Sequence, residues 1–181
     1  MQHTDQLLNN INEGWHDFYM LLGTASAALV ALLFVAASIG AGFLTPERST
    51  ATRTFMSPVV FHYSTTLLMS LIALIPVHTP ISLTVGIAAV AVAGLAYTTM
   101  VLVGLARASI TDIADRFGYG LFPLAAYLAM LASAGLMLSR PPFGADILAA
   151  ALLLLLAVNI RNAWDLMLAF ARQVASKKSD T

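Results

Sequence analysis

The chain has 181 residues, of which 59% are apolar and 10% are charged. Soluble domains usually carry about 25% charged residues, so this composition excludes an ordinary water-soluble protein and indicates a membrane protein. Nine basic and nine acidic residues cancel, which leaves no positive surplus for binding nucleic acid. The chain contains no cysteine, which excludes disulfides, thiolate metal sites and cysteine nucleophiles.

The first predicted element, residues 1–17, is a short amphipathic helix. Its apolar residues recur at helical spacing, opposite a face of asparagine and glutamate. The segment contains no lysine or arginine, so it lacks the charged start of a secretory signal. We predict that this helix lies on the outer membrane surface. A helix that binds a partner or covers a pore is the alternative.

Five apolar stretches follow, and each is close to or above the roughly 20 residues that cross a bilayer as a helix. They are residues 18–44, 55–77, 81–105, 119–138 and 147–170. A polar tail, residues 171–181, ends the chain. The predicted fold class is therefore an all-α, integral membrane helical bundle, with five transmembrane helices in residues 18–170.

The basic residues predict the orientation of this bundle. Eight of the nine fall on the side of the membrane that holds the C-terminus, and only Arg140 falls on the other. Because basic residues concentrate in cytoplasmic loops, we expect the N-terminus outside, the C-terminus inside and a cytoplasmic tail. A count of four spans would distribute the basic residues over both sides.

The third span, residues 81–105, carries a ridge of small side chains at alternating four- and three-residue steps. The ridge consists of Ser82, Gly86, Ala89, Ala93 and Ala96. Helices in a bilayer associate through such closely packing surfaces. We expect the ridge to pack inside the bundle, and a subunit interface is the alternative. Since five helices have little interior of their own, we also expect a homo-oligomer.

The second span, residues 55–77, carries polar side chains along one face. His62, Thr66 and Ser70 follow at four-residue steps, and Tyr63 widens the polar region. Such a face must contact other helices or water, because lipid tails offer no hydrogen bonds. An imidazole that titrates near neutral pH could gate or carry protons there. We favour a pore or solute path over a histidine satisfied by a neighbouring hydroxyl.

The inner end of the last span carries a second polar group, at a depth similar to that of His62. Its members are Asn159, Arg161, Asn162 and Asp165. Arg161 and Asp165 are spaced i, i+4 and can pair on one helix face. They either form an inner gate or charge filter, or Arg161 extends to the inner headgroups with Asp165 as its partner.

A third group lies at the outer surface, where Glu13, His16 and Asp17 share about one helical turn and His78 lies in a facing loop. Imidazole with carboxylate suits zinc, but we favour a solvated patch and predict no metal site. No phosphate-binding loop or hydrolase motif occurs. A b-type haem usually needs two facing histidines, and only His62 lies within a predicted span. We therefore expect no cofactor, no catalytic residues and no enzyme.

Three segments resemble an uncharacterised family of small multi-span bacterial inner-membrane proteins. They are GWHDFYMLLGTASAALVALLFVAAS, RTFMSPVVFHYSTTLLMSLIALIP and NIRNAWDLMLAF. The resemblance implies a helical, multi-pass protein of a bacterial inner membrane and carries no activity. From the polar residues we predict an oligomeric channel or transporter that passes an ion or small solute along the second span. The alternative is a non-transporting subunit that scaffolds or regulates a partner membrane protein.

Overall fold

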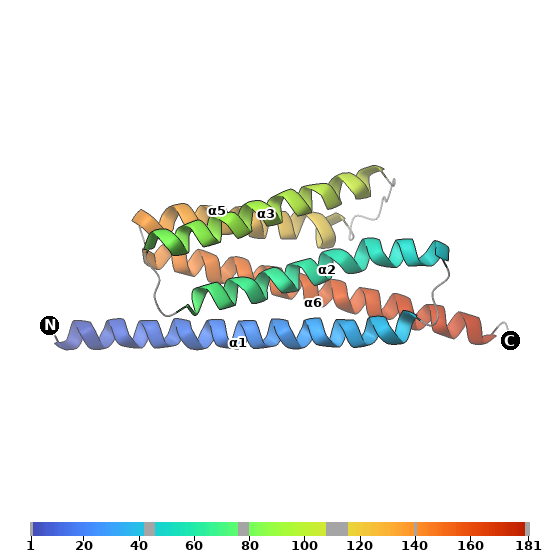
Figure 1. Cartoon of the computed structure of the whole chain (residues 1–181), viewed down its shortest axis with the longest axis horizontal. Helices are drawn as coiled ribbons and strands as arrows, with labels where there is room; N and C mark the ends of the chain where they lie inside the picture. The colour runs from blue at the N-terminus through green and yellow to red at the C-terminus, as the bar shows by residue number, and fades with distance from the viewer. Residues whose placement is uncertain (1, 42–45, 76–79, 108–115, 140, 180–181) are drawn as a thin grey trace.

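The computed structural model describes residues 2–41, 46–75, 80–107, 116–139 and 141–179, and these residues are helical except at positions 74 and 75. The elements in chain order are α1 (Gln2–Ala41), α2 (Pro46–Ala73), α3 (Pro80–Arg107), the π-helix η1 (Phe117–Leu121), α5 (Phe122–Ser139) and α6 (Pro141–Ser179). The helices run along the long axis of the molecule (Figure 1).

Four of the helical segments are long and apolar enough to cross a membrane. They are Gly14–Ser38, Ile81–Arg107, Phe117–Ser139 and Pro142–Leu168. The chain is thus an all-helical protein with the helices of a multi-pass membrane protein, which confirms the predicted fold class in this form. The apolar part of α2, Ser57–Ala73, is shorter, so the fifth span is not confirmed by length and composition.

Proline defines where three of the helices begin. α2, α3 and α6 start at Pro46, Pro80 and Pro141. A proline at the first helical position is favourable, because its fixed φ is helical and its missing N–H would have no partner there.

The structure differs from the sequence prediction at the start of the chain. α1 is one unbroken helix of 40 residues, Gln2–Ala41, and Figure 1 shows it straight along its length. We predicted a boundary between residues 17 and 18. Only Gly14 interrupts the local run of helix-compatible residues. One glycine costs a helix about 1 kcal/mol, which is too little to separate an N-terminal helix from the span that follows.

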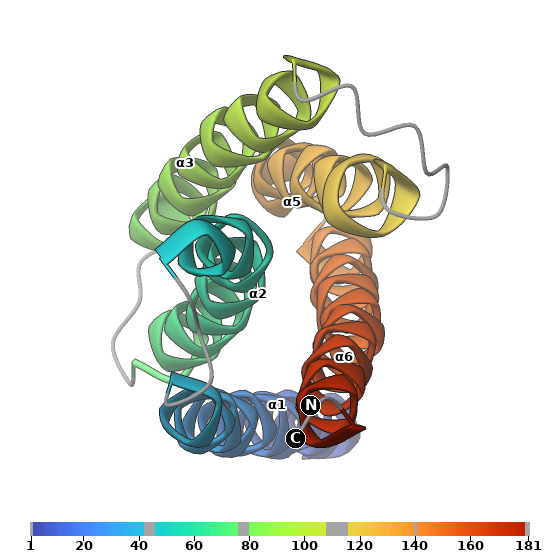
Figure 2. The ribbon, with the colours of Figure 1, turned by 90° about the vertical axis from the view of Figure 1, so that its right-hand side faces the viewer.

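The helix α2 lies against three other helices. It packs on α1, α3 and α6, while α5 packs between α3 and α6. Seen along the bundle in Figure 2, α2 lies between α1 and α3 and toward the middle of the molecule. This position explains why the polar face of α2 is buried.

The small-residue ridge of α3 mostly faces outward, contrary to our expectation that it packs inside the bundle. Ala89 and Ala93 are exposed and Gly86 is half-buried. The neighbouring face is buried instead and consists of Ile87, Ala91, Gly94, Thr98 and Leu105. Both faces are rich in small side chains, so their spacing alone does not decide which one packs.

Candidate functional site

His62 lies in the interior of the bundle and joins α2 to α5. Its side chain is fully buried, and its Nδ1 lies 2.8 Å from the Tyr127 hydroxyl. The ring also meets Tyr97 of α3 edge-on, with the ring centroids 6.1 Å apart. The opposite ring nitrogen, Nε2, has no hydrogen-bond partner in the part of the chain that the structure describes. His62 therefore has one fixed nitrogen and one that is open to a further partner.

A glycine on α3 makes room for this arrangement. The ring of Tyr127 lies directly against Gly94, and a Cβ on residue 94 would overlap three atoms of that ring. Gly94 was not among the candidate residues from the sequence. The sequence gives only a weak indication of this role. A glycine within an apolar helix costs about 1 kcal/mol relative to alanine, so its presence suggests that close packing requires it.

The other hydroxyls of the polar face are satisfied within α2. Thr66 donates to the carbonyl of His62 at 3.0 Å, and Ser70 donates to the carbonyl of Thr66 at 2.9 Å. Such i to i−4 bonds leave the helix intact and free the hydroxyls from needing another acceptor. Ser70 packs against Gly23 of α1. A Cβ added to Gly23 would lie 3.0 Å from the Cβ of Ser70. The predicted path therefore divides between two helix interfaces.

Tyr63 is separated from His62 by the turn of the helix. It is fully buried in a cluster with Leu33 of α1, Leu105 of α3 and Leu166 of α6. Its hydroxyl has no hydrogen-bond partner among the described residues. Tyr63 therefore contributes a second unsatisfied polar atom, at a different interface from that of His62.

The four polar residues of α6 do not form one group. Asn159 and Asn162 are buried, whereas the side chains of Arg161 and Asp165 are 50% and 48% exposed. The latter two form an ion pair of 3.7 Å. The amide of Asn159 donates to the carbonyl of Leu155 at 2.7 Å, and its Oδ1 has no partner in the described segments.

Asn162 holds the π-helix against α6. Its Nδ2 donates to the carbonyl of Gly118 at 2.9 Å, and the hydroxyl of Tyr119 donates to the Asn162 carbonyl at 3.2 Å. A Cβ on Gly118 would lie 2.7 Å from Asn162 Oδ1, so this approach requires glycine. Neither the π-helix nor its contact with Asn162 was predicted.

Buried polar atoms without a partner are the common feature of this region. Among the described residues, such atoms belong to His62 and Tyr63 of α2, Thr98 of α3 and Asn159 of α6, and also to Ser26 and Thr84 elsewhere in the bundle. An unpaired buried donor or acceptor costs about 1–3 kcal/mol, and proteins usually satisfy such atoms with buried water. Each of these atoms therefore calls for a polar partner, such as a buried water.

The outer patch is described only in part. His16 Nδ1 lies 3.5 Å from Asp17 Oδ1, and both side chains are exposed. The side chain of Glu13 and all of His78 lie outside the described residues. Within the described residues, no group of three or more histidine, aspartate or glutamate side chains could hold a metal ion.

The described part of the chain is all-helical, and four of its helices are long and apolar enough for a multi-pass membrane protein. Comparison of the chain with known protein families, curated proteins and solved structures finds no match. The resemblance seen in the sequence stays a prediction for this reason, and the function is argued from the residues themselves.

Proposed function

We propose that this chain is the subunit of an oligomeric channel or transporter that passes an ion or small solute through the bundle beside His62. The observation that carries the proposal is the state of the His62 ring, which is fully buried with Nδ1 bonded to Tyr127 and Nε2 unpartnered among the described residues. A buried ring nitrogen needs a polar partner, and a permeating water, proton or solute supplies one.

The hydrogen bond to Tyr127 gives His62 the connectivity of a relay. A tyrosine hydroxyl both donates and accepts, and an imidazole exchanges donor and acceptor roles between its two nitrogens. A proton accepted at Nε2 is therefore matched by one released from Nδ1 toward Tyr127. Thr98 and Asn159 supply further buried oxygens on two other helices, so that a hydrated path has partners on α2, α3 and α6.

The inner end of the path is closed by packing. Asn162 and Gly118 are in direct contact there, and the ion pair of Arg161 with Asp165 lies beside them at the surface. Passage requires η1 to separate from α6. Fixed charges at that position select the ions that enter, which is the role we propose for Arg161 and Asp165 in a five-span protein of a bacterial inner membrane.

Flux through purified protein in liposomes tests the proposal, with several cations, anions and proton gradients over a range of pH. We expect His62→Ala to reduce the flux to the background of empty liposomes, while His16→Ala, which changes an exposed histidine, leaves it unchanged. Circular dichroism of each variant checks that the helices are retained. Equal flux in both variants and the wild type would remove His62 from the path, and no flux under any condition would refute the proposal.

A non-transporting scaffold is the second candidate, favoured by the outward position of the α3 ridge. Gly86, Ala89 and Ala93 present small side chains to the surface, where a helix of another subunit can approach closely. Ala89→Leu should then dissociate the assembly in mild detergent, measured by mass, while Ala132→Leu on the exposed face of α5 should not. Retained assembly in both variants would exclude the ridge as an interface.

A further inference from the structure

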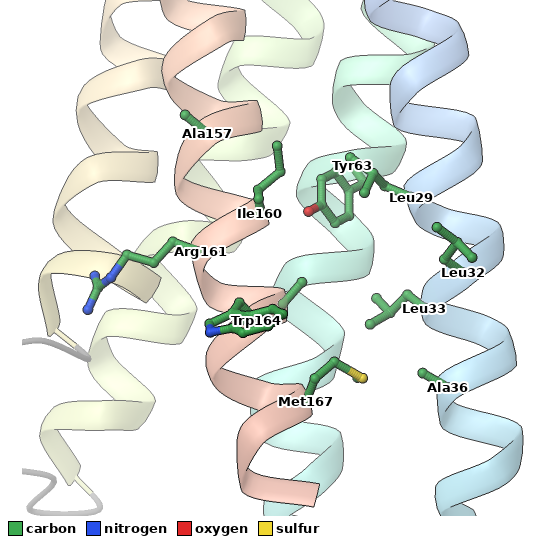
Figure 3. Close-up of a pocket in the computed structure, with 11 residues that line it drawn as sticks. Leu29, Leu32, Leu33, Ala36, Tyr63, Ala157, Ile160, Arg161, Trp164 and Met167 are labelled. Atoms are coloured by element: carbon green, nitrogen blue, oxygen red, sulfur yellow. The ribbon is translucent and has the colours of Figure 1, made fainter. Parts of the chain in front are cut away.

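An apolar groove of about 560 Å³ runs between α1 and α6. Its walls are Leu29, Leu32 and Ala36 on one side and Ala157, Ile160 and Trp164 on the other (Figure 3). Leu32, Ile160 and Trp164 are exposed, so the groove opens toward the surroundings of the bundle. Its size lies within the roughly 300–1,000 Å³ of typical small-molecule sites.

Tyr63 is one of the polar residues that line this groove, together with Arg161 and Trp164. Figure 3 shows the Tyr63 hydroxyl directed toward α6, on the side of Ile160. The side chain is fully buried, and the hydroxyl has no partner in the described part of the chain. Because burying an unpaired hydroxyl is costly, a hydrogen-bond acceptor placed here gains more than an apolar group does.

No charged group of the lining residues points into the groove. Arg161 contributes to the lining, but in Figure 3 its guanidinium points away from the groove, toward η1 and α5. There it forms an ion pair with Asp165 at 3.7 Å, and its Nη1 would lie 3.3 Å from a Cβ on Gly118. The site therefore lacks what an anionic headgroup needs and suits a neutral molecule.

We infer that this groove binds a neutral isoprenoid quinone from the bilayer, with a ring carbonyl accepting a hydrogen bond from Tyr63. Such a molecule combines an apolar body with a carbonyl that can enter the hydrocarbon region. A phospholipid acyl chain fills the walls equally well but carries no acceptor at this depth. Tyr63 lies about 9 Å along α2 from the start of its apolar part at Ser57, too deep for ester groups.

The two tryptophans of the chain, Trp15 and Trp164, make binding measurable. In a Trp15→Phe background, Trp164 is the only tryptophan and lies in the groove, and quinones quench indole fluorescence on contact. Titration with decylubiquinone in detergent should give saturable quenching. We expect Tyr63→Phe, which removes only the hydroxyl, to weaken the apparent Kd by about two- to tenfold.

A matched pair of α6 variants tests the location. Ala157→Phe fills the groove and should abolish saturable quenching, whereas Ala150→Phe should not. Ala150 is exposed on nearly the same face, about 10 Å further along the helix. Linear quenching that is equal in all variants would overturn the inference, because it reports collision only. Displacement of decylubiquinone by phospholipid at equal mole fraction would assign the groove to acyl chains and overturn it too.

A second copy of the chain is the remaining occupant. If a second copy fills the groove, Ala157→Phe should change the mass of the assembly in detergent, and the unsubstituted protein should show no saturable quenching. This result also overturns the inference. The groove does not involve His62. Loss of flux in His62→Ala with retained quenching, or the reverse, therefore separates the quinone site from the proposed transport path.

Discussion

The position of Tyr127 depends on residues from two other helices. His62 holds the hydroxyl through a 2.8 Å hydrogen bond, and Gly94 leaves the space that the ring occupies. Buried polar pairs of this kind are stabilising only when their geometry is kept. The two contacts therefore act together, and moving the ring by the width of one methyl group strains the bond to His62.

Gly94→Ala should destabilise the protein by about 1–3 kcal/mol, because the added Cβ overlaps the ring of Tyr127. Gly104→Ala is the matched control on the same helix, since no atom lies within 4 Å of its added Cβ. The control should be neutral or stabilising by about 0.5–1 kcal/mol, through the helix propensity of alanine. Unfolding in mixed detergent and sodium dodecyl sulfate, followed by circular dichroism, measures both, and equal stabilities would contradict the proposed fit.

At the residue scale, the sequence predicted that His62 is buried but did not predict its hydrogen bond to Tyr127. A histidine far from a helix end cannot extend to water, which made its interior position predictable. The pairing with Tyr127 depends on how α2, α3 and α5 cross, and hydrophobic patterns do not encode crossing. Arg161 and Asn162 show the same limit, because adjacent helix positions differ by 100° and one lies outside while the other is buried.

The π-helix η1 is attached to α6 by two hydrogen bonds of different kinds. The side chain of Asn162 donates to a carbonyl of η1, and Tyr119 of η1 donates to the backbone of α6. π-Helical turns are rare and frequent at functional sites. Here the turn coincides with the closed inner end of the proposed path.

Asn162→Ala should loosen η1, because it leaves the buried Gly118 carbonyl without its donor at a cost of about 1–3 kcal/mol. We expect amide hydrogen exchange of residues 117–121 to accelerate by roughly tenfold for each 1.4 kcal/mol lost. Asn159→Ala is the matched control, since the Asn159 amide bonds only its own helix. Similar exchange in both variants would mean that Asn162 does not hold the π-helix.

Element-scale prediction succeeded where one physical signal dominated. Long apolar runs predicted the helices, because backbone groups in lipid must be satisfied internally. The face that α3 buries was not predictable, since Ala91 and Gly94 on one face are as small as Ala89 and Ala93 on the next. The continuity of α1 was missed because a change of polarity along a helix is not a break in its backbone.

At the scale of the whole molecule, the lengths of the helices bear on how they can cross a membrane. The N- and C-termini lie at opposite ends of the long axis (Figure 1). α1 and α6 contain 40 and 39 residues, so each is about 60 Å long and exceeds the roughly 40–45 Å of a whole bilayer. α2 runs beside both of them, although its apolar part is short. The five-span topology predicted from the basic residues therefore depends on whether α2 crosses the membrane.

Labelling of single cysteines decides between four and five spans, and the absence of native cysteine makes the experiment clean. His16→Cys and Arg172→Cys place a thiol at exposed positions near the two ends of the bundle. In intact cells, a membrane-impermeant maleimide should label residue 16 and leave residue 172 unlabelled until the membrane is opened. Labelling of both positions from outside would require an even number of crossings. In that case α2 would lie within the bundle without crossing, and the polar face around His62 could not form a path from one side of the membrane to the other.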